Sequence, residues 1–378
     1  MTRPTPDEPT REEPGRATGE EPAGTRRPPP EDPGRVTPDG PGRVTPDGPG
    51  RVAPGVVQAY LGCLDRADLV GATRLATGLL DAGASVADVL VDLVAVAQRE
   101  VGLRWLSGRW SIAQEHAATH VSEQVVEVVV AHTAPTDDRG HVVLACVEGE
   151  WHALAARIVM EVVRAAGWRV TFLGASVPVR QLVSYLHQTG PDAVLLSCVQ
   201  PSRLVRAGRM VEACRAAGVP VVAGGPGFGP EGRWATTVGA AGWGATARDA
   251  VRLLSGPLLA APHTGAAPTA GSDEYVPVLR RRRELVQLVL REVTPVAERA
   301  EEVAGVVAQL VDALAAAIRI GDPQLLVEFV RWQAGVLDTG DGARLLDDVL
   351  RVCATALTEH PRSADHLHRA RTALATPP

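Results

Sequence analysis

A carboxylate and an imidazole two positions apart, Glu150 and His152, are the residues of this chain best placed to do chemistry. They follow an apolar run at 141–147 that is typical of a buried strand, and an amphipathic helix pattern begins at Leu154. We therefore expect His152 in a loop at the carboxyl end of a strand, where open α/β sheets place ligands. A carboxylate so placed can hold a metal-bound imidazole in one tautomer. A surface or capping histidine is the alternative for this pair alone.

Two further strand ends carry residues that could line the same site. Ser197 and Val199 lie at the end of the apolar run 192–198, and Gly224-Gly225 follows the run 219–223. A serine hydroxyl can hydrogen-bond a buried base, and glycines let the backbone approach a ligand closely. A plain turn after the strand is the alternative for the two glycines.

The elements that must position these residues alternate between strand and helix. The predicted strands are 141–147, 168–173, 192–198, 219–223 and 241–244, and the predicted helices are 152–166, 178–189, 203–217 and 247–254. Such alternation indicates a parallel sheet covered by helices on both faces. The expected fold class is α/β, with a flavodoxin-like doubly wound sheet over 139–254.

Helical regions are expected on both sides of this sheet. Apolar spacing over 55–134, with breaks at 65–68, 83–85 and 107–111, predicts a helical bundle. Residues 275–378 are expected to form an all-α domain, joined by a linker at 255–274, and we interpret it as the output domain. Residues 1–54 repeat Pro-Gly-Arg-Val-Thr-Pro-Asp-Gly and are expected to be a disordered tail.

Composition narrows the classes of function. A length of 378 residues predicts two or three domains, and a net charge of −6 gives no general attraction to nucleic acid. The arginine run 280–283 is accordingly interpreted as a solvated helix entrance. The five cysteines occur singly, which indicates reduced core thiols in a cytoplasmic protein. We expect no signal peptide and no apolar run of membrane-spanning length.

The three strand-end loops resemble the signature of the cobalamin-binding fold: Asp/Glu-x-His-x-x-Gly, then Ser-x-Leu, then Gly-Gly. The resemblance implies that His152 is the lower axial ligand of cobalt, replacing the cofactor's own dimethylbenzimidazole, and that Glu150 tunes the imidazole. Ser197 and the two glycines would line the cleft for the displaced nucleotide tail. Ala155 stands where the family has glycine, and Val199 where it has leucine. The other residues expected at the cofactor are Trp151, Gly174, Ser176, Val177 and Phe228.

The helical bundle carries a second pattern, Trp105 followed by Glu115-His116. It resembles the Trp-x9-Glu-His pattern of adenosylcobalamin-dependent photoreceptors, the light-sensing transcription regulators related to the MerR family. The resemblance implies that Trp105 packs on the deoxyadenosyl group and that Glu115 contacts it. His116 would bind the upper face of cobalt after light breaks the Co–C bond. A core aromatic and a solvated helix face are the alternative.

The resemblance therefore implies a cobalamin-binding sensor rather than an enzyme, with adenosylcobalamin as the expected form and methylcobalamin or hydroxocobalamin as the other forms. Light is the expected signal, and a protein partner such as a transcription regulator the expected recipient. Direct contact with nucleic acid or membrane is not expected, and a homo-oligomer remains open. The rival reading is a corrinoid protein that carries methyl groups between methyltransferases, and a module that no longer holds cobalamin is a third.

Overall fold

The computed structural model describes residues 52–132, 138–257, 271–293, 300–337 and 342–375. The predicted tail falls outside these ranges apart from its last residues, and so does most of the predicted linker. The expectations for those two segments therefore stay predictions.

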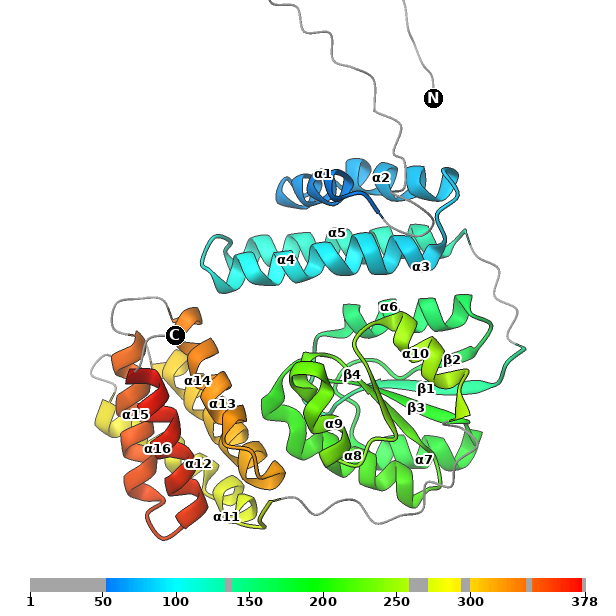
Figure 1. The fold of residues 1–378 in the computed structure, drawn as a ribbon. Coiled ribbons are helices and arrows are strands. Elements are labelled where there is room, and N and C mark those ends of the chain that lie inside the picture. Colours follow the sequence, from blue (N-terminus) through cyan, green and yellow to red (C-terminus); the bar gives the residue numbers. More distant parts are fainter. Residues whose placement is uncertain (1–51, 133–137, 258–270, 294–299, 338–341, 376–378) are drawn as a thin grey trace, which may run out of the picture. The chain divides into compact units, whose positions relative to one another are not determined.

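A five-stranded parallel sheet occupies the middle of the described chain, with the strand order β2-β1-β3-β4-β5 (Figure 1). Its strands are β1 (His141–Cys146), β2 (Arg169–Phe172), β3 (Ala193–Ser197), β4 (Val221–Gly224) and β5 (Gly242–Gly244). This is the flavodoxin-like order, and the predicted fold class is confirmed. The order reverses at β1 and β3, so the carboxyl ends of these two strands form the switch point where such sheets bind ligands.

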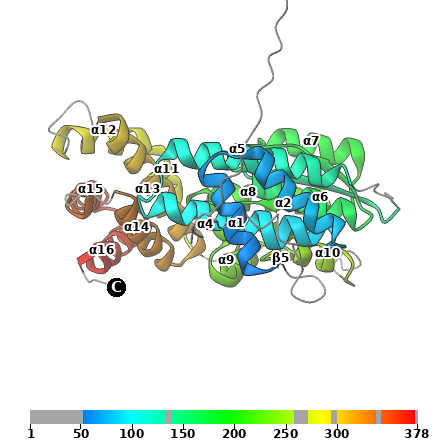
Figure 2. The same ribbon diagram turned by 90° about the horizontal axis from the view of Figure 1, so that it is seen from above.

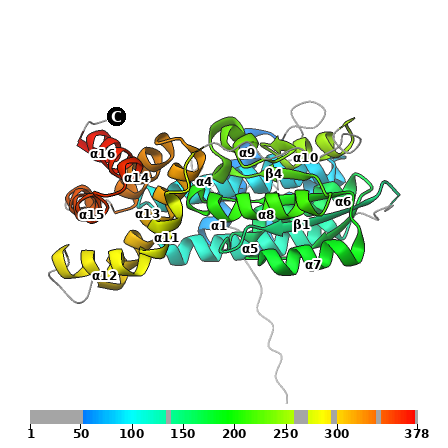
Figure 3. The same ribbon diagram turned by 90° about the horizontal axis from the view of Figure 1, so that it is seen from below.

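Helices cover both faces of this sheet. Helices α6 (Ala153–Ala165) and α10 (Ala247–Leu254) lie on one face, and α7 (Val179–Thr189) and α8 (Leu204–Ala216) on the other (Figures 1 and 3). Side chains of β1 alternate between the two: Val142 and Leu144 pack with α6 and α10, whereas Val143 packs with α7 and α8. Burial on both faces explains why the strands are continuous apolar runs.

The N-terminal region is helical, as predicted. It comprises α1 (Pro54–Asp65), α2 (Leu69–Asp81), α3 (Val86–Asp88), the π-helical turn η1 (Val89–Val94), α4 (Ala95–Leu106) and α5 (Ile112–Val130). Two of its helices start at capping boxes, in which Ser85 pairs with Asp88 and Ser111 with Gln114. The predicted breaks coincide with these starts, because capping residues interrupt the apolar pattern there. The sequence did not indicate the π-helical turn.

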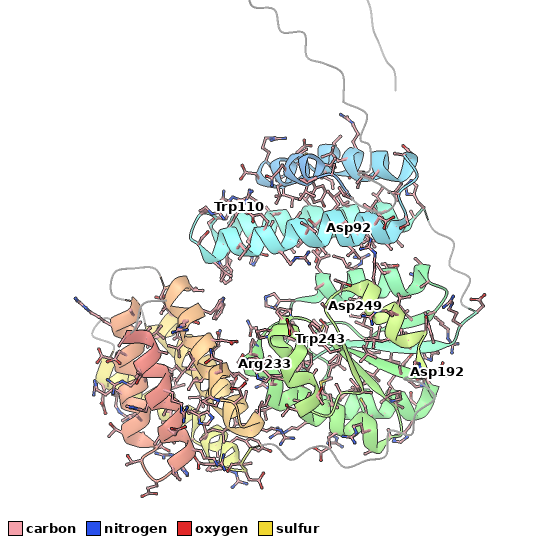
Figure 4. The ribbon with its side chains drawn as sticks, in the orientation of Figure 1. Asp92, Trp110, Asp192, Arg233, Trp243 and Asp249 are labelled. Atoms are coloured by element: carbon pink, nitrogen blue, oxygen red, sulfur yellow. The ribbon has the colours of Figure 1, made fainter. Side chains whose placement is uncertain are left out.

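An ion pair joins the helical bundle to the α/β region. Arg248 on α10 contacts Asp88 at 2.7 Å and Asp92 at 2.9 Å; Asp92 is labelled in Figure 4. Ile158 and Val162 of α6 complete the apolar core of the bundle. The bundle is therefore packed on the same helix that His152 begins.

The C-terminal region is all-α, as predicted. It comprises α11 (Tyr275–Arg280), α12 (Arg282–Val293), α13 (Ala300–Ile320), α14 (Gln324–Val336), α15 (Gly342–Ala356) and α16 (Pro361–Ala375). Helices α14, α15 and α16 lie side by side in two views (Figures 1 and 2). Arg281 and Arg282, from the predicted solvated run, find partners within this region, namely Glu284 and Asp312.

Helix α13 is the central element of the C-terminal region. Its length and hydropathy would suffice to cross a membrane, contrary to the expectation that no apolar run is long enough, and 72% of its apolar window is buried inside the protein. This degree of burial is typical of a core helix. Residues of α13 and of the α7–α8 face of the sheet belong to one continuous apolar cluster.

Polar contacts also join the C-terminal helices to the α/β region. Asp322 accepts a hydrogen bond of 2.8 Å from the indole Nε1 of Trp234. Trp234 lies on the short helix α9 (Arg233–Thr237), a helix that the sequence did not predict. Arg233, labelled in Figure 4, pairs with Glu328 at 3.0 Å. The C-terminal region is thus docked through apolar and polar contacts.

Replacing Leu314 by Ala tests the role of α13 as a core helix. Leu314 is fully buried, so we expect the free energy of unfolding to fall by about 2–5 kcal/mol. Urea-induced unfolding measures the change. The exposed Glu301 on the same helix provides the control, since Glu301→Ala should change this free energy by less than about 0.5 kcal/mol. An equal, small effect of both substitutions would contradict the assignment.

Candidate functional site

The loop between β1 and α6 presents His152 at the start of a helix. His152 is the residue that precedes the first turn of α6, and its side chain is 58% exposed. The side chain of Glu150, two residues earlier, is only 1% exposed. Gly149 makes this reversal with φ of +85°, a conformation that favours glycine. The loop therefore buries the carboxylate and leaves the imidazole accessible.

Glu150 accepts hydrogen bonds from two different loops. One carboxylate oxygen, Oε1, lies 2.5 Å from Nδ1 of His152 and 3.1 Å from its backbone nitrogen. The other, Oε2, accepts hydrogen bonds from the backbone nitrogens of Val199 at 2.8 Å and Gln200 at 3.1 Å, beyond β3. The pair predicted from the sequence thus exists, and it also fixes the loop after β3.

These contacts shift the ionisation of both groups. Burial alone would raise the pKa of Glu150, but the hydrogen bonds from His152 and Val199 outweigh it and hold this pKa below its ordinary value. The hydrogen bond to Glu150 raises the pKa of His152, although burial opposes the shift. With Nδ1 directed to Glu150, Nε2 is the ring nitrogen that can bind a metal.

The loop after β2 is joined to the same place. The backbone nitrogen of Ser176 donates to the carbonyl of Glu150 at 2.9 Å, and the Ser176 hydroxyl accepts from the backbone of Gly149 at 3.0 Å. The carbonyl of Gly174 accepts from the backbone of Cys146 at 3.1 Å. A Cβ added at Gly174 would meet no atom within 4 Å, so the backbone there borders open space. The loops after β1, β2 and β3 are therefore joined to one another at the switch point.

The two glycines after β4 differ in their surroundings. Gly225 has φ of +100°, and a Cβ there would strike the carbonyl oxygen of Cys198. A Cβ at Gly224 would make only an ordinary contact of 3.5 Å with the carbonyl oxygen of Gly244. Packing thus accounts for Gly225, whereas Gly224 leaves room beside the half-buried Ser197.

Two expected cofactor residues lie in the core instead. Phe228 is 0% exposed and Val177 is 6% exposed, and both belong to the apolar cluster below the sheet. The short helix η3 (Pro226–Phe228) places Phe228 fully in the core, and the expectation that Phe228 contacts the cofactor stays a prediction. Trp151 has the opposite character, with 73% of its surface exposed next to His152.

The bundle residues Trp105, Glu115 and His116 lie at the facing ends of α4 and α5. Trp105 is half-buried, and His116 is 72% exposed, with its Nε2 3.5 Å from Glu115. Glu115 is held by a hydrogen bond of 2.8 Å from the hydroxyl of Thr119. The charge of Glu115 also contributes to the raised pKa of His152, which brings the bundle motif into electrostatic range of the loop histidine.

The residues at the switch point fit a corrinoid cofactor. A corrinoid, when bound, would bring most ligands of its own cobalt, and His152 would offer Nε2 as a ligand from the protein. The described residues contain no group of three or more His, Cys, Asp or Glu side chains that could hold a bare metal ion. A Cβ at Gly174 would meet no atom within 4 Å, and one at Gly224 would make only an ordinary contact, so neither backbone is closely covered by neighbouring atoms.

The sequence did not reveal several contacts of this site. The amides of Val199 and Gln200 carry no side-chain signal, and the hydrogen bond between Thr119 and Gln98 at 3.2 Å joins two different helices.

A cavity of about 680 Å³ lies away from this site, lined by Asp88, Arg248 and neighbours on α2, α6 and α10. None of the residues predicted for the cofactor site lines it.

Comparison with known protein families identifies the two regions that carry these motifs. Residues 140–252 match a family model described as "B12 binding domain", and residues 56–129 match a second model with the same description. Both regions are B12 binding domains. The chain is thus a cobalamin-binding protein, and no DNA-binding domain is evident in the matched region.

Curated relatives are of two kinds. The transcriptional repressor CarH of Myxococcus xanthus is 37% identical over 100 residues, which are 26% of this chain and 33% of the repressor. The repressor CarA of the same organism is 34% identical over 127 residues, 33% of this chain and 44% of the repressor. Trimethylamine corrinoid protein 1 of Methanosarcina mazei is 24% identical over 197 residues, 50% of this chain and 90% of that protein.

Among solved structures, the monomethylamine corrinoid protein of Methanosarcina barkeri is similar. It is 18% identical, with a TM-score of 0.47, and the match covers 53% of this chain and 96% of that protein.

Replacing Glu150 by Gln should lower the pKa of His152. The hydrogen bond and the charge that raise this pKa are lost, whereas the burial that lowers it remains. Titration of the imidazole ring protons by NMR in the cofactor-free protein measures the shift. The pKa of His141, whose shift has other causes, should not change. An unchanged pKa of His152 would show that the pair does not form in solution.

The pKa shifts of Glu150 and His152 predict a pH range in which the pair stabilises the fold. Glu150 has a lowered pKa, so it stabilises the fold above its ordinary value of 4.5, and this contribution is lost as the pH falls through its folded pKa. His152 has a raised pKa, so its contribution is complete below 6.5 and is lost as the pH rises through its folded pKa. Thermal melting of wild type and Glu150→Gln should therefore differ most between these two values.

The two glycines after β4 give a matched pair of variants. Gly225→Ala should lower the free energy of unfolding by more than about 1 kcal/mol, because alanine is strained at positive φ. Gly224→Ala should leave thermal stability near that of wild type but weaken cobalamin binding, because the methyl group enters the room that a ligand needs. Equal melting temperatures for the two variants, or equal binding to wild type for Gly224→Ala, would contradict this division.

Proposed function

We propose that this cobalamin-binding chain is an adenosylcobalamin-dependent light sensor that signals through protein contacts. The observation that carries the proposal is the double arrangement around His152. Glu150 orients this imidazole from below, and Glu115, next to His116 and in the Trp105 motif, acts on it from the bundle. A carrier of small groups needs the first arrangement but not the second.

The residues below the cofactor would orient and hold it. Glu150 accepts a hydrogen bond from the Nδ1–H group of His152, which in the neutral ring leaves the lone pair of Nε2 available for cobalt. The loops that carry Ser197 and Gly224, neighbours on β3 and β4, would border the displaced nucleotide tail. Because Glu150 bonds both the histidine and the loop after β3, the metal ligand and the tail cleft are positioned together.

The residues above the cofactor would respond to light. Adenosylcobalamin, when bound, supplies a Co–C bond that visible light breaks. Trp105 would cover the deoxyadenosyl group, and Glu115, anchored by Thr119, would contact it. His116 is 72% exposed, its ring pairs with Glu115 among the residues that the structure describes, and it would turn toward the metal after the adenosyl group leaves. A neutral imidazole there is a suitable ligand for the oxidised metal.

The output would pass to a protein partner in the cytoplasm, with a transcription regulator as the expected recipient. Two relatives are named transcriptional repressors, while the matched region of this chain has no evident DNA-binding domain. The C-terminal helices are the natural surface for this contact, since the family matches end at residue 252.

The second candidate is a corrinoid protein that carries methyl groups in a methyltransferase system. The coverage of the relatives favours it: the match extends over 90% of a trimethylamine corrinoid protein but only 33% of CarH. This function would need His152, Ser197 and Gly224, but neither Trp105 nor His116.

Illumination of the protein loaded with adenosylcobalamin separates the two functions. In wild type, green light should shift the visible absorption bands to those of a bis-histidine adduct that persists in the dark. In His116→Ala, water or hydroxide should take the position, and the spectrum should resemble hydroxocobalamin bound by one histidine. His120→Ala, one turn further along α5, is the control and should behave as wild type.

The lower ligand is tested with the same spectra. His152→Ala should weaken cobalamin binding at least ~10-fold, a typical cost of lost support at a metal site. Identical illuminated spectra for wild type and His116→Ala would remove the photoreceptor mechanism and favour the methyl carrier. Unchanged affinity of His152→Ala would remove the site itself.

A further inference from the structure

A buried cluster of charges joins helix α13 to the segment that follows the β3 loop. Asp312, with a side chain 4% exposed, lies 3.4 Å from Nη1 of Arg203 and 3.9 Å from Nη2 of Arg206. Arg282 approaches the same carboxylate at 3.1 Å from within the C-terminal region. One carboxylate of the C-terminal helices therefore holds two arginines of the cofactor domain.

Both of these arginines border the Glu150 loop. A Cβ added at Gly149 would lie 2.7 Å from Nη1 of Arg206 and 3.6 Å from Cζ of Arg203, so the two guanidinium groups cover this glycine. Arg203 also belongs to the turn η2 (Pro201–Arg203), directly after the amides that Glu150 binds. The arginines thus lie beside the carboxylate of Asp312 and next to the loop that carries Glu150.

Two anions compete for Arg203. Burial, followed by repulsion from Arg206, lowers the pKa of Arg203, while the charges of Asp312 and Glu150 both raise it. Asp312 binds Nη1 of the Arg203 guanidinium. The Nε atom of Arg203 is buried and has no hydrogen-bond partner among the described residues. If Asp312 lost its charge, Glu150 would be the anion left to attract Arg203.

That attraction would act against His152. All four acceptor positions of Glu150 are filled, by the ring and backbone nitrogens of His152 and by the amides of Val199 and Gln200. A guanidinium could bind Glu150 only by displacing one of these donors. The imidazole is the donor on the exposed side chain and is the easiest to displace.

We propose that Asp312 is a positioning residue for the cobalamin site: by binding Arg203, it keeps this guanidinium away from Glu150 and leaves Glu150 to orient His152. The C-terminal helices are then part of the support of the cofactor loop, through the carboxylate of Asp312. This inference rests on the proposed role of His152 as the cobalt ligand.

The test compares Asp312→Asn with a matched control on the same helical region. Asp322 also joins the C-terminal helices to the α/β domain, through Trp234, but it contacts neither Arg203 nor Arg206. Asp312→Asn in the full chain should weaken adenosylcobalamin binding roughly 10-fold and lower the fraction of bound cofactor with histidine as its lower ligand, read from the absorption spectrum. Asp322→Asn should leave both quantities as in wild type, while thermal melting of the cofactor-free proteins reports any loss of docking.

A second substitution tests whether the loss in Asp312→Asn acts through Arg203. Asp312→Asn combined with Arg203→Gln should restore histidine ligation, because the competing guanidinium is gone. Three results would each overturn the proposal while leaving His152 as the ligand. Asp312→Asn could bind adenosylcobalamin as wild type does, Asp322→Asn could lose as much affinity as Asp312→Asn, or Arg203→Gln could fail to restore histidine ligation. Failure of wild type itself to bind cobalamin would overturn the proposed function and this inference with it.

Discussion

The cofactor site depends on the satisfaction of one buried carboxylate. Glu150 is 1% exposed, and leaving such a charge without partners in the interior would cost several kcal/mol by typical estimates. Its two oxygens are instead bonded by the imidazole and amide of His152 and by two amides beyond β3. Since these donors come from both strands at the switch point, the carboxylate can be buried only when the two loops hold their positions. The orientation of His152 is a consequence of that requirement.

The surroundings of Glu150 divide into a fixed and an adjustable part. Below the sheet edge, the strands and the glycine turns are set by packing, as the close approach of Gly225 to Cys198 illustrates. The adjustable part consists of charges from outside the α/β domain, Glu115 from the bundle and Asp312 from the C-terminal helices, the latter acting through Arg203. If His152 ligates cobalt as proposed, its ligation would respond to charges from both flanking helical regions, which would suit a sensor.

The sequence predicted most of the fold because the strands, buried on both faces, are apolar runs and the helices are amphipathic. It predicted the Glu150–His152 pair because both members lie in one short loop. It could not predict that Phe228 turns into the core or that Gly225 is required by Cys198, since both depend on how β4 lies beside β3. The contact between Arg203 and Asp312 spans 109 residues, and no local pattern encodes such a pairing.

The most direct test of the account is the identity of the atom below cobalt. Electron paramagnetic resonance of the protein loaded with cobalamin and reduced to the Co(II) form reports the axial nitrogen through its hyperfine splitting. With all histidines labelled with nitrogen-15 and the cofactor unlabelled, the account predicts the splitting pattern of nitrogen-15, lost in His152→Ala. A pattern that stays that of nitrogen-14 would show that dimethylbenzimidazole remains bound and that His152 is not the ligand.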